Sequence, residues 1–393
     1  MEAFIVAGEP SGDRQGAALA KEIWRREPQA DIAGVGAWAM AQAGVSIAFD
    51  SAGWAAIGVG EALKKAPALW FALRALRRRL LTGPPAVLVL IDFGAFNLRL
   101  ARSLQGSGIP ILYYFPPRSW SRVPATGGLT DLVDAIATPF RWSQGVLAGG
   151  RAQVRWVGHP LVDQVQPTTA PAPARERWGV ASGERLVAVV PGSRRQELRY
   201  LLPELASAAR ALDGQLPGLR FAISAAPGVS RDELEQRFRR LGSEPIIVDG
   251  LNPDLLQLAQ VALVTSGTAT LELAILGVPM VVVYKLSPVH RLQYAILCRL
   301  RGPLRFVAMP NLIAERAVVP ELLQDRARGD LIAAEARKLL DQPAAAQRVR
   351  GDLLAVAAEL GPPGAAGRAA EMALALAHNR PIRDDLGTGA AEA

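Results

Sequence analysis

A turn of small residues, Thr265–Thr268, follows the apolar run Val261–Val264 and precedes a short helix-forming segment. Small residues let main-chain N–H groups approach a ligand closely, and a helix start adds the positive end of its dipole, so this turn could seat a diphosphate. Glu272 lies one helical turn beyond Thr268, where its carboxylate could accept hydrogen bonds from both hydroxyls of a ribose. We interpret the stretch as a candidate nucleotide half-site; an ordinary strand–turn–helix with Ser266 as N-cap is the alternative.

A second turn of this kind is expected where the strand Leu186–Val190 ends in Pro191-Gly192-Ser193-Arg194. Ser193 and Gln196 have the spacing of a capping box, which predicts a helix start. Arg194 then lies in the first helical turn, where the helix dipole disfavours a cation and a bound anion would cancel that cost. Both turns therefore point to one acidic diphosphate. A solvated surface charge is the alternative for Arg194.

Three carboxylates follow strands of the N-terminal half and could do acid–base chemistry. Glu9 and Asp13 lie in the glycine-containing turn and helix start after the strand Ala3–Ala7, and Asp92 ends the continuous apolar run Ala86–Ile91. Doubly wound domains bind ligands outside the carboxyl ends of their strands, so these carboxylates are expected to face a ligand. Glu9 and Asp13 are equally compatible with turn or capping roles.

His159 is the one imidazole expected on the ligand side, at the junction between two domains. Its reference pKa would suit a general base. A contact to phosphate and a hinge position, including a hinge histidine bonded to the backbone, are the other roles open to it.

The elements that must position these residues form two series of alternating strands and helices. The first covers residues 1–163 and the second 164–365, joined at a Pro-, Thr- and Ala-rich stretch, Gln164–Ala174, without apolar periodicity. This pattern predicts an α/β protein with two Rossmann-like, doubly wound domains, a cleft between them and the nucleotide on the second. Residues 366–393 are expected to form a C-terminal helix, a candidate to pack back on the first domain, and a loose polar tail.

The segment Glu61–Leu81 is predicted to be a basic amphipathic helix. One stripe of it carries Ala62, Ala66, Leu69, Trp70, Leu73, Leu76 and Leu80, and most of its lysines and arginines lie off that stripe. Packing on the sheet is the commoner use of such a stripe, and binding to an anionic membrane surface is the alternative.

Composition narrows the class of protein. The chain has 393 residues and a formal net charge of +8, without the aromatic–basic interleaving of a nucleic-acid platform, so acidic small substrates or an anionic membrane are favoured as partners. The single cysteine, Cys298, excludes intrachain disulfides and thiolate clusters, and three histidines without ligand spacing argue against a zinc site. No signal peptide and no apolar run of spanning length are found, so a cytoplasmic location is expected.

Six short motifs occur in one order over nearly the whole chain and resemble the lipid-A-disaccharide synthase family. They are Ala7-Gly8-Glu9-x-Ser11-Gly12-Asp13; Ile91-Asp92 with Phe96-Asn97-Leu98-Arg99; Val157-Gly158-His159-Pro160-Leu161; Pro191-Gly192-Ser193-Arg194; Ser266-Gly267-Thr268-Ala269-Thr270-Leu271-Glu272; and Pro310-Asn311-Leu312 with Val319-Pro320-Glu321-Leu322.

The resemblance implies a GT-B fold and an inverting, metal-independent glycosyltransferase at the cytoplasmic membrane face, with no cofactor besides its donor. That activity joins UDP-2,3-diacylglucosamine to 2,3-diacylglucosamine 1-phosphate in a β-1,6 bond and releases UDP. It would place UDP on Gly192, Ser193, Arg194, Ser266, Gly267, Thr268, Thr270 and Glu272, with His159 and Asn311 as further candidates. Peripheral membrane contact is expected, and an oligomer is left open.

Two stretches of the first half depart from the family pattern. The family pattern after its central strand is Ile-Asp-x-Pro-Asp-Phe-Asn, and the resemblance implies that the second aspartate is the base. In this chain Gly94 and Ala95 stand at the positions of that Pro-Asp pair. The loop Ser-Pro-Ser-x-Trp-Ala-Trp is also altered, to the sequence of residues 115–121. We therefore expect a divergent member that keeps UDP-sugar binding, with Asp92, Asp13 or Glu9 as base. Another acceptor, a UDP-sugar epimerase and a non-catalytic nucleotide-sugar-binding protein are the alternatives.

Overall fold

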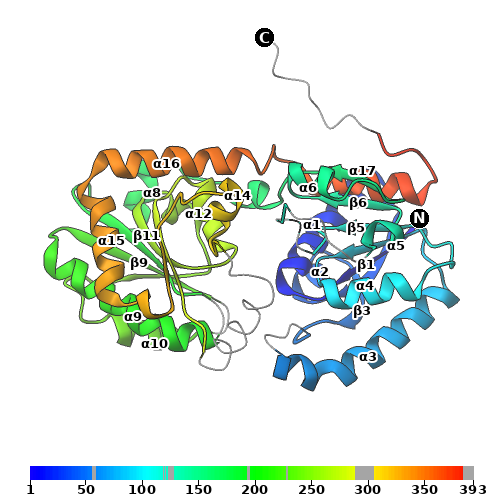
Figure 1. Cartoon of the computed structure of the whole chain (residues 1–393), viewed down its shortest axis with the longest axis horizontal. Coiled ribbons are helices and arrows are strands. Elements are labelled where there is room, and N and C mark those ends of the chain that lie inside the picture. The colour runs from blue at the N-terminus through cyan, green and yellow to red at the C-terminus, as the bar shows by residue number, and fades with distance from the viewer. Residues whose placement is uncertain are drawn as a thin grey trace, which may run out of the picture. The chain divides into compact units, whose positions relative to one another are not determined.

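The computed structural model describes residues 1–54, 59–117, 119, 121–122, 128–192, 195–226, 229–287 and 305–383, with only the backbone for 59–64 and 195–197. The chain forms two compact units, Met1–Asp163 with Leu360–Ala393, and Gln164–Glu359 (Figure 1). Each is an α/β unit built on a parallel sheet, as predicted.

The first unit contains a seven-stranded parallel sheet in the order β3-β2-β1-β4-β5-β6-β7. The strands are β1 (Glu2–Ala7), β2 (Asp31–Gly36), β3 (Ser46–Asp50), β4 (Val87–Ile91), β5 (Ile111–Tyr114), β6 (Ala135–Thr138) and β7 (Gln153–Trp156). Every residue of β4 is buried, because a central parallel strand is covered on both faces and must be apolar throughout.

Helices cover both faces of this sheet. They are α1 (Pro10–Arg26), α2 (Trp38–Gln42), α3 (Val59–Thr82), α4 (Gly94–Ser103), α5 (Leu129–Leu132), α6 (Arg141–Val146), α7 (Leu161–Gln164) and α17 (Ala365–Ala377). Alternate residues of each strand point to opposite faces, so Ile5 packs among residues of α1 and α17, whereas Phe4 packs with Leu76 and Leu80 of α3.

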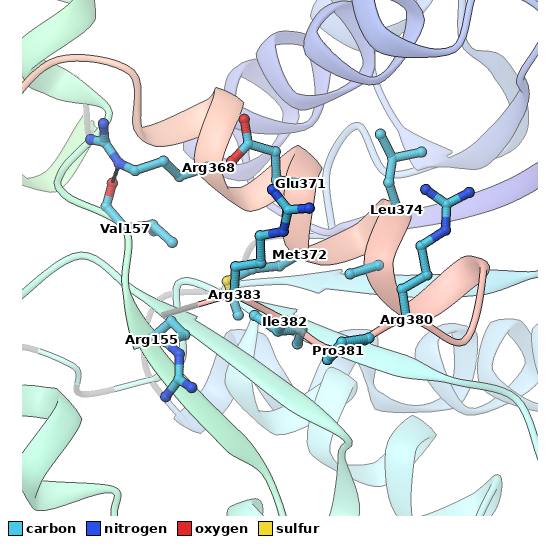
Figure 2. Close-up of a pocket in the computed structure, with 11 residues that line it drawn as sticks. Arg155, Val157, Arg368, Glu371, Met372, Leu374, Arg380, Pro381, Ile382 and Arg383 are labelled. Carbon is cyan, nitrogen blue, oxygen red and sulfur yellow. Dashed lines mark hydrogen bonds between the residues drawn. The ribbon is translucent and has the colours of Figure 1, made fainter. Parts of the chain in front are cut away.

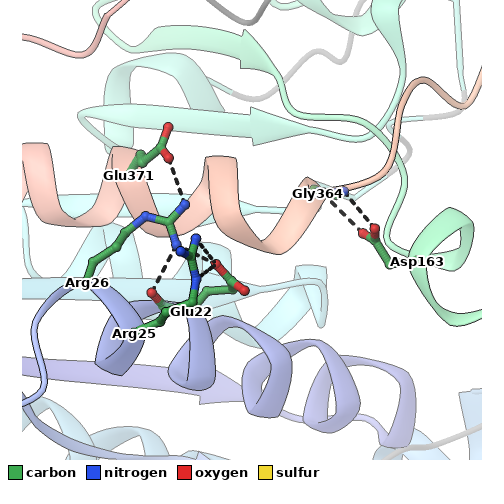
Figure 3. Close-up of polar contacts among 7 residues, drawn as sticks. Glu22, Arg25, Arg26, Asp163, Gly364 and Glu371 are labelled. Carbon is green, nitrogen blue, oxygen red and sulfur yellow. Dashed lines mark hydrogen bonds and ion pairs between the residues drawn. The ribbon is translucent and has the colours of Figure 1, made fainter.

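Helix α17 closes one face of the first unit although it comes from the end of the chain. It packs on α1 and on β4, β5 and β6. Asp163 accepts hydrogen bonds from the N–H groups of Gly364 (2.6 Å) and Ala365 (3.2 Å) at the start of α17, and Arg26 of α1 binds Glu371 at 2.7 Å (Figure 3). The first unit resumes at Leu360, earlier than the expected residue 366, because Leu360 is buried and its carbonyl accepts the His159 N–H.

A cavity of about 530 Å³ lies beside α17, lined among others by Arg155, Arg368, Arg380, Met372 and Ile382 (Figure 2). Arg368 donates through Nε to the carbonyl of Val157 at 2.9 Å. No predicted site residue lines this cavity within the described parts of the chain.

The second unit contains a six-stranded parallel sheet in the order β10-β9-β8-β11-β12-β13. Its strands are β8 (Arg185–Val190), β9 (Leu219–Ala225), β10 (Ile246–Asp249), β11 (Ala259–Thr265), β12 (Met280–Tyr284) and β13 (Glu321–Leu323). Its helices are α8 (Pro171–Arg177), α9 (Arg195–Gln215), α10 (Arg231–Phe238), α11 (Pro253–Leu256), α12 (Ala269–Ile275), α14 (Met309–Ala314), a 3₁₀ turn at Gln324–Arg326, α15 (Gly329–Asp341) and α16 (Pro343–Ala358).

Part of the stretch predicted to be a linker is ordered against the second unit. Residues 171–177 form α8. The carboxylate of Asp254 accepts hydrogen bonds from the N–H groups of Thr168 (2.6 Å) and Thr169 (2.8 Å) and from the Thr168 hydroxyl (2.8 Å). The stretch predicted to be a linker begins at the boundary between the two units, and these polar bonds order part of it against the second unit without apolar contacts.

Candidate active site

The two turns predicted to hold a diphosphate leave neighbouring strands of the second sheet. Val190 of β8 and Val264 of β11 are register partners, and parallel strands end at the same sheet edge. Their turns therefore start about 4.8 Å apart. Gly192 has a φ of +93°, a conformation that favours glycine, and α9 begins at Arg195, close to the predicted helix start. Ser193 and Arg194 lie outside the described residues.

The turn after β11 divides into exposed and structural parts. Gly267 and Thr268 are exposed, and Glu272 is half-buried in the first turn of α12. The Ser266 hydroxyl donates to the carbonyl of Val307 at 2.7 Å, and the N-cap position is Thr268, so the alternative role of Ser266 as N-cap is wrong. Thr270 is buried, and its hydroxyl donates to the Gly267 carbonyl at 2.7 Å, which leaves only acceptor capacity for a ligand.

Asn311 is committed to the protein rather than to a ligand. Its Nδ2 donates to the carbonyl of Val319 (2.9 Å) and to Glu321 Oε1 (2.8 Å), and its Oδ1 accepts the N–H groups of Val318 (2.7 Å) and Val319 (2.9 Å). A side-chain amide has two donor and two acceptor positions, and all four are filled. The expectation that Asn311 contacts UDP is therefore not supported by its geometry: it ties α14 to the turn before β13.

Two of the three candidate carboxylates lie at the carboxyl edge of the first sheet on adjacent strands. Ala7 of β1 pairs with Ile91 of β4, which places the turn containing Glu9 beside Asp92. Burial and, to a smaller extent, the negative charge of Glu9 raise the pKa of Asp92 to about 6, while the Phe93 N–H opposes that rise. A carboxylate with such a pKa can exchange a proton near neutral pH.

Asp13 has the capping role that was one of its two predicted alternatives. It is buried, and its carboxylate accepts the N–H groups of Ala37 (2.7 Å), Ala39 (2.7 Å) and Met40 (3.2 Å). Both oxygens satisfy main-chain donors at the start of α2. This geometry favours a structural role over that of a base.

His159 is buried beneath aromatic rings rather than presented to a ligand. Its ring lies 5.0 Å from that of Phe115 and 5.6 Å from that of Phe140, and its Nδ1 accepts the N–H of Leu161 at 3.2 Å. Burial lowers the pKa of His159 to about 3, so the imidazole is neutral and offers no charge to a phosphate. The alternative of a histidine bonded to the backbone agrees with this geometry.

The two departures from the family pattern lie close to each other at one point, Gly94 and Pro117. Ala95 is exposed in the first turn of α4, where its methyl group replaces the expected carboxylate. A Cβ atom on Gly94 would lie 2.7 Å from the Cβ of Pro117, in the altered loop. A side chain at position 94, such as the family's proline, would therefore require Pro117 or the backbone to shift.

Phe93, Asn97 and Tyr113 were not singled out from the sequence as site residues, yet they surround Asp92. Asn97 Nδ2 and the Tyr113 hydroxyl both donate to the carbonyl of Asp92, at 2.9 and 2.6 Å. Asn97 belongs to the motif Phe96-Asn97-Leu98-Arg99, but no spacing in the sequence connects it with Tyr113, which lies on the next strand of the sheet.

A family profile described as lipid-A-disaccharide synthetase matches residues 3–360. The lipid-A-disaccharide synthases of Geobacter sulfurreducens and Myxococcus xanthus are each 36% identical to the chain, covering 95% of it and 96% and 97% of their own lengths. The chain belongs to the lipid-A-disaccharide synthase family. The predictions of this family and of a glycosyltransferase are confirmed.

Solved structures establish the fold. Staphylococcus aureus MnaA, determined with UDP, has a TM-score of 0.67 and 12% identity, covering 97% of this chain and 98% of its own. The UDP-GlcNAc 2-epimerase of Neisseria meningitidis bound to UDP-GlcNAc has a TM-score of 0.61 and 11% identity, covering 97% and 100%. With the two parallel sheets, these similarities confirm the GT-B fold of this family member.

Proposed function

We propose that this glycosyltransferase moves 2,3-diacylglucosamine from UDP to 2,3-diacylglucosamine 1-phosphate, forming a β-1,6 bond and releasing UDP. Family membership over nearly the whole chain supports this choice of substrates. The assignment of the UDP-sugar donor to the second unit depends on the pairing of Val190 with Val264, because both predicted diphosphate turns then start at one sheet edge.

The donor is assigned to the second unit. Main-chain N–H groups around Gly192 and Gly267, the helix starts of α9 and α12 and the charge of Arg194 would bind the diphosphate, and Glu272 would accept from the ribose hydroxyls. The same groups would stabilise the negative charge that develops on the departing UDP, which an inverting transfer requires. A metal ion is not needed for that step.

The acceptor is assigned to the first unit, with Asp92 as the base. In the transfer, the acceptor 6-hydroxyl oxygen forms a bond to C1 of the donor sugar, the bond from C1 to the UDP oxygen breaks, and the hydroxyl proton passes to Asp92. Support comes from the position of Asp92 at the end of β4, from its raised pKa, and from the negative charge of Glu9 nearby. Asp13 is the weaker candidate because it caps α2.

Peripheral binding to the cytoplasmic membrane face is assigned to α3. Leu76 and Leu80 are buried on the first sheet, as the packing interpretation predicted, whereas Trp70 and Phe71 are 49% and 66% exposed. The Arg74 guanidinium lies 4.7 Å from the Trp70 ring centroid. Exposed aromatic rings among cations suit an anionic lipid surface, where both diacylated substrates reside. Within the described residues, no helix is long and apolar enough to span a membrane.

One assay tests the proposal. Purified protein is incubated with UDP-2,3-diacylglucosamine and 2,3-diacylglucosamine 1-phosphate, and we expect UDP and the β-1,6 disaccharide. Release of UDP only with another acceptor, an epimerised UDP-sugar, or UDP binding without any turnover would each contradict it. The missing carboxylate at Ala95 is the observation that makes another acceptor the second candidate.

A further inference from the structure

Two consecutive residues at the end of β4 have left-handed backbone conformations. Asp92 has a φ of +44° and Phe93 a φ of +45°. Residues other than glycine rarely adopt this region of backbone conformation. A bulky residue keeps it only where the surrounding structure imposes it. The chain turns sharply at this point, and the Asp92 side chain stays half-buried at the strand end.

Side-chain hydrogen bonds from two other elements hold this turn. The Tyr113 hydroxyl, from β5, donates to the carbonyl of Asp92 at 2.6 Å, and Asn97 Nδ2, from α4, donates to the same oxygen at 2.9 Å and to the carbonyl of Ile91 at 3.1 Å. Fixing the Asp92 carbonyl fixes the peptide plane between Asp92 and Phe93, and hence the rotation that connects the two strained residues.

Packing holds the turn from its other side. A Cβ atom on Gly8 would lie 2.2 Å from the Phe93 ring, so the ring occupies space that only glycine leaves open. The Phe93 ring also lies 5.4 Å from that of Phe96 and 6.2 Å from that of Trp54. Aromatic packing on one side and two hydrogen-bond donors on the other therefore hold the turn in place.

We infer that Tyr113 is a positioning residue, whose hydroxyl, with the Asn97 amide, holds the Asp92 turn in the left-handed conformation that aims the carboxylate at the acceptor hydroxyl. This inference rests on the proposed function of Asp92. As a buried residue of β5 with only a packing role, Tyr113 would have no part in the transfer.

The neighbouring tyrosine provides a matched control. Tyr113 and Tyr114 are consecutive on β5 and both fully buried, but the Tyr114 hydroxyl has no hydrogen-bond partner among the described residues. Tyr113→Phe and Tyr114→Phe each remove one buried oxygen from the same strand. Only the first removes a bond to Asp92.

The test measures kcat and KM for both variants and repeats Tyr113→Phe in an Asp92→Asn background. Misplacement of a base lowers the rate of the chemical step. Tyr113→Phe is therefore expected to lower kcat about 10- to 100-fold and to change the KM for the UDP-sugar by less than about twofold. Tyr114→Phe should keep both values. In the Asp92→Asn background, Tyr113→Phe should have little further effect, because the two residues act as a unit.

The inference is overturned if Tyr113→Phe keeps the wild-type kcat, or if it lowers kcat equally with and without the Asp92 carboxylate. A wild-type protein without turnover would instead contradict the proposed function. The carbon-13 resonance of the Asp92 carboxyl then decides the inference without activity: its titration midpoint should move in Tyr113→Phe and stay in Tyr114→Phe, and an unmoved midpoint in Tyr113→Phe overturns it.

Discussion

Val190 of β8 and Val264 of β11 are register partners in adjacent parallel strands of the second sheet. The turns that follow them, at Gly192 and Gly267, consequently start at neighbouring strand ends. This relationship joins two stretches that lie more than 70 residues apart in the sequence into one candidate site.

Arg194→Ala is expected to weaken UDP binding. The guanidinium would make charge-assisted hydrogen bonds to the diphosphate, and losing them should raise the Kd by about 10- to 100-fold. Isothermal titration calorimetry with UDP measures this. Arg210→Ala is the control, because Arg210 is an exposed arginine of α9 that donates to the Arg237 carbonyl, and it should leave the Kd unchanged. Equal affinity of both variants would remove Arg194 from the site.

Asp92→Asn is expected to lower turnover about 100-fold or more while leaving the UDP affinity intact, because an amide cannot accept the acceptor proton. In the wild type, activity should fall as the pH drops through about 6, where Asp92 becomes protonated. Glu9→Gln removes a negative neighbour, which lowers the pKa of Asp92 and moves this fall to lower pH. Unaltered turnover in Asp92→Asn would mean that another group is the base.

The same variant makes a prediction about stability. The folded pKa of Asp92, about 6, lies above its ordinary value of 3.8, so ionisation destabilises the fold as the pH rises between these values. Asp92→Asn should thus raise the free energy of unfolding by up to about 3 kcal/mol at neutral pH, and by little below about pH 4. Urea unfolding at several pH values measures this, and a pH-independent difference would contradict it.

Ala95→Asp is expected to increase turnover with the diacyl acceptor phosphate. Ala95 is exposed at the start of α4, so a carboxylate fits there and is stabilised by the helix dipole by about 0.3–1 kcal/mol. Gly94→Pro should instead destabilise the protein unless Pro117 is also replaced, because of the 2.7 Å approach. If Ala95→Asp leaves turnover unaltered, no base is missing at this position.

Replacing Trp70 and Phe71 together by serine is expected to abolish binding to anionic vesicles without unfolding the protein. Both rings are exposed, whereas Leu76 and Leu80 hold α3 on the sheet. Co-sedimentation with phosphatidylglycerol vesicles measures this, and wild-type binding should weaken with salt. Leu354→Ser, at a 47% exposed residue of α16, should bind as the wild type does. Failure of the wild type to sediment at low salt would refute the membrane role of α3.

Asn311→Ala is expected to destabilise the protein by about 2–4 kcal/mol, because it leaves the buried N–H groups of Val318 and Val319 without their acceptor. Its folded fraction should bind UDP normally, which calorimetry corrected for active protein can measure. A selective loss of UDP affinity with unchanged unfolding would restore Asn311 to the nucleotide site.

Local patterns were enough to predict several elements. The apolar runs at Ala86–Ile91 and Val261–Val264 became buried parallel strands, and the glycine-containing turns after Val190 and Val264 became the turns described here. Such features depend on residues close together in the sequence, and the hydrophobic period and turn chemistry encode them directly.

The roles of single polar side chains were harder to predict. Asp13, His159 and Asn311 all stand in motifs that suggested chemistry, yet each satisfies main-chain groups of the protein. Whether a buried polar group faces a ligand or the backbone depends on which donors and acceptors the fold brings within about 3 Å.

Residue identity, hydrophobic period and motif order are properties of the chain, so the α/β class, the two series of strands, the family resemblance and the absence of a carboxylate at position 95 could be predicted without coordinates. The fold was needed to show that the turns after Val190 and Val264 share a sheet edge, that Pro117 occupies the space of a side chain at Gly94, and that the Tyr113 hydroxyl binds the Asp92 carbonyl. Strand order and hydrogen bonding join residues remote in sequence, and no local period specifies those pairs.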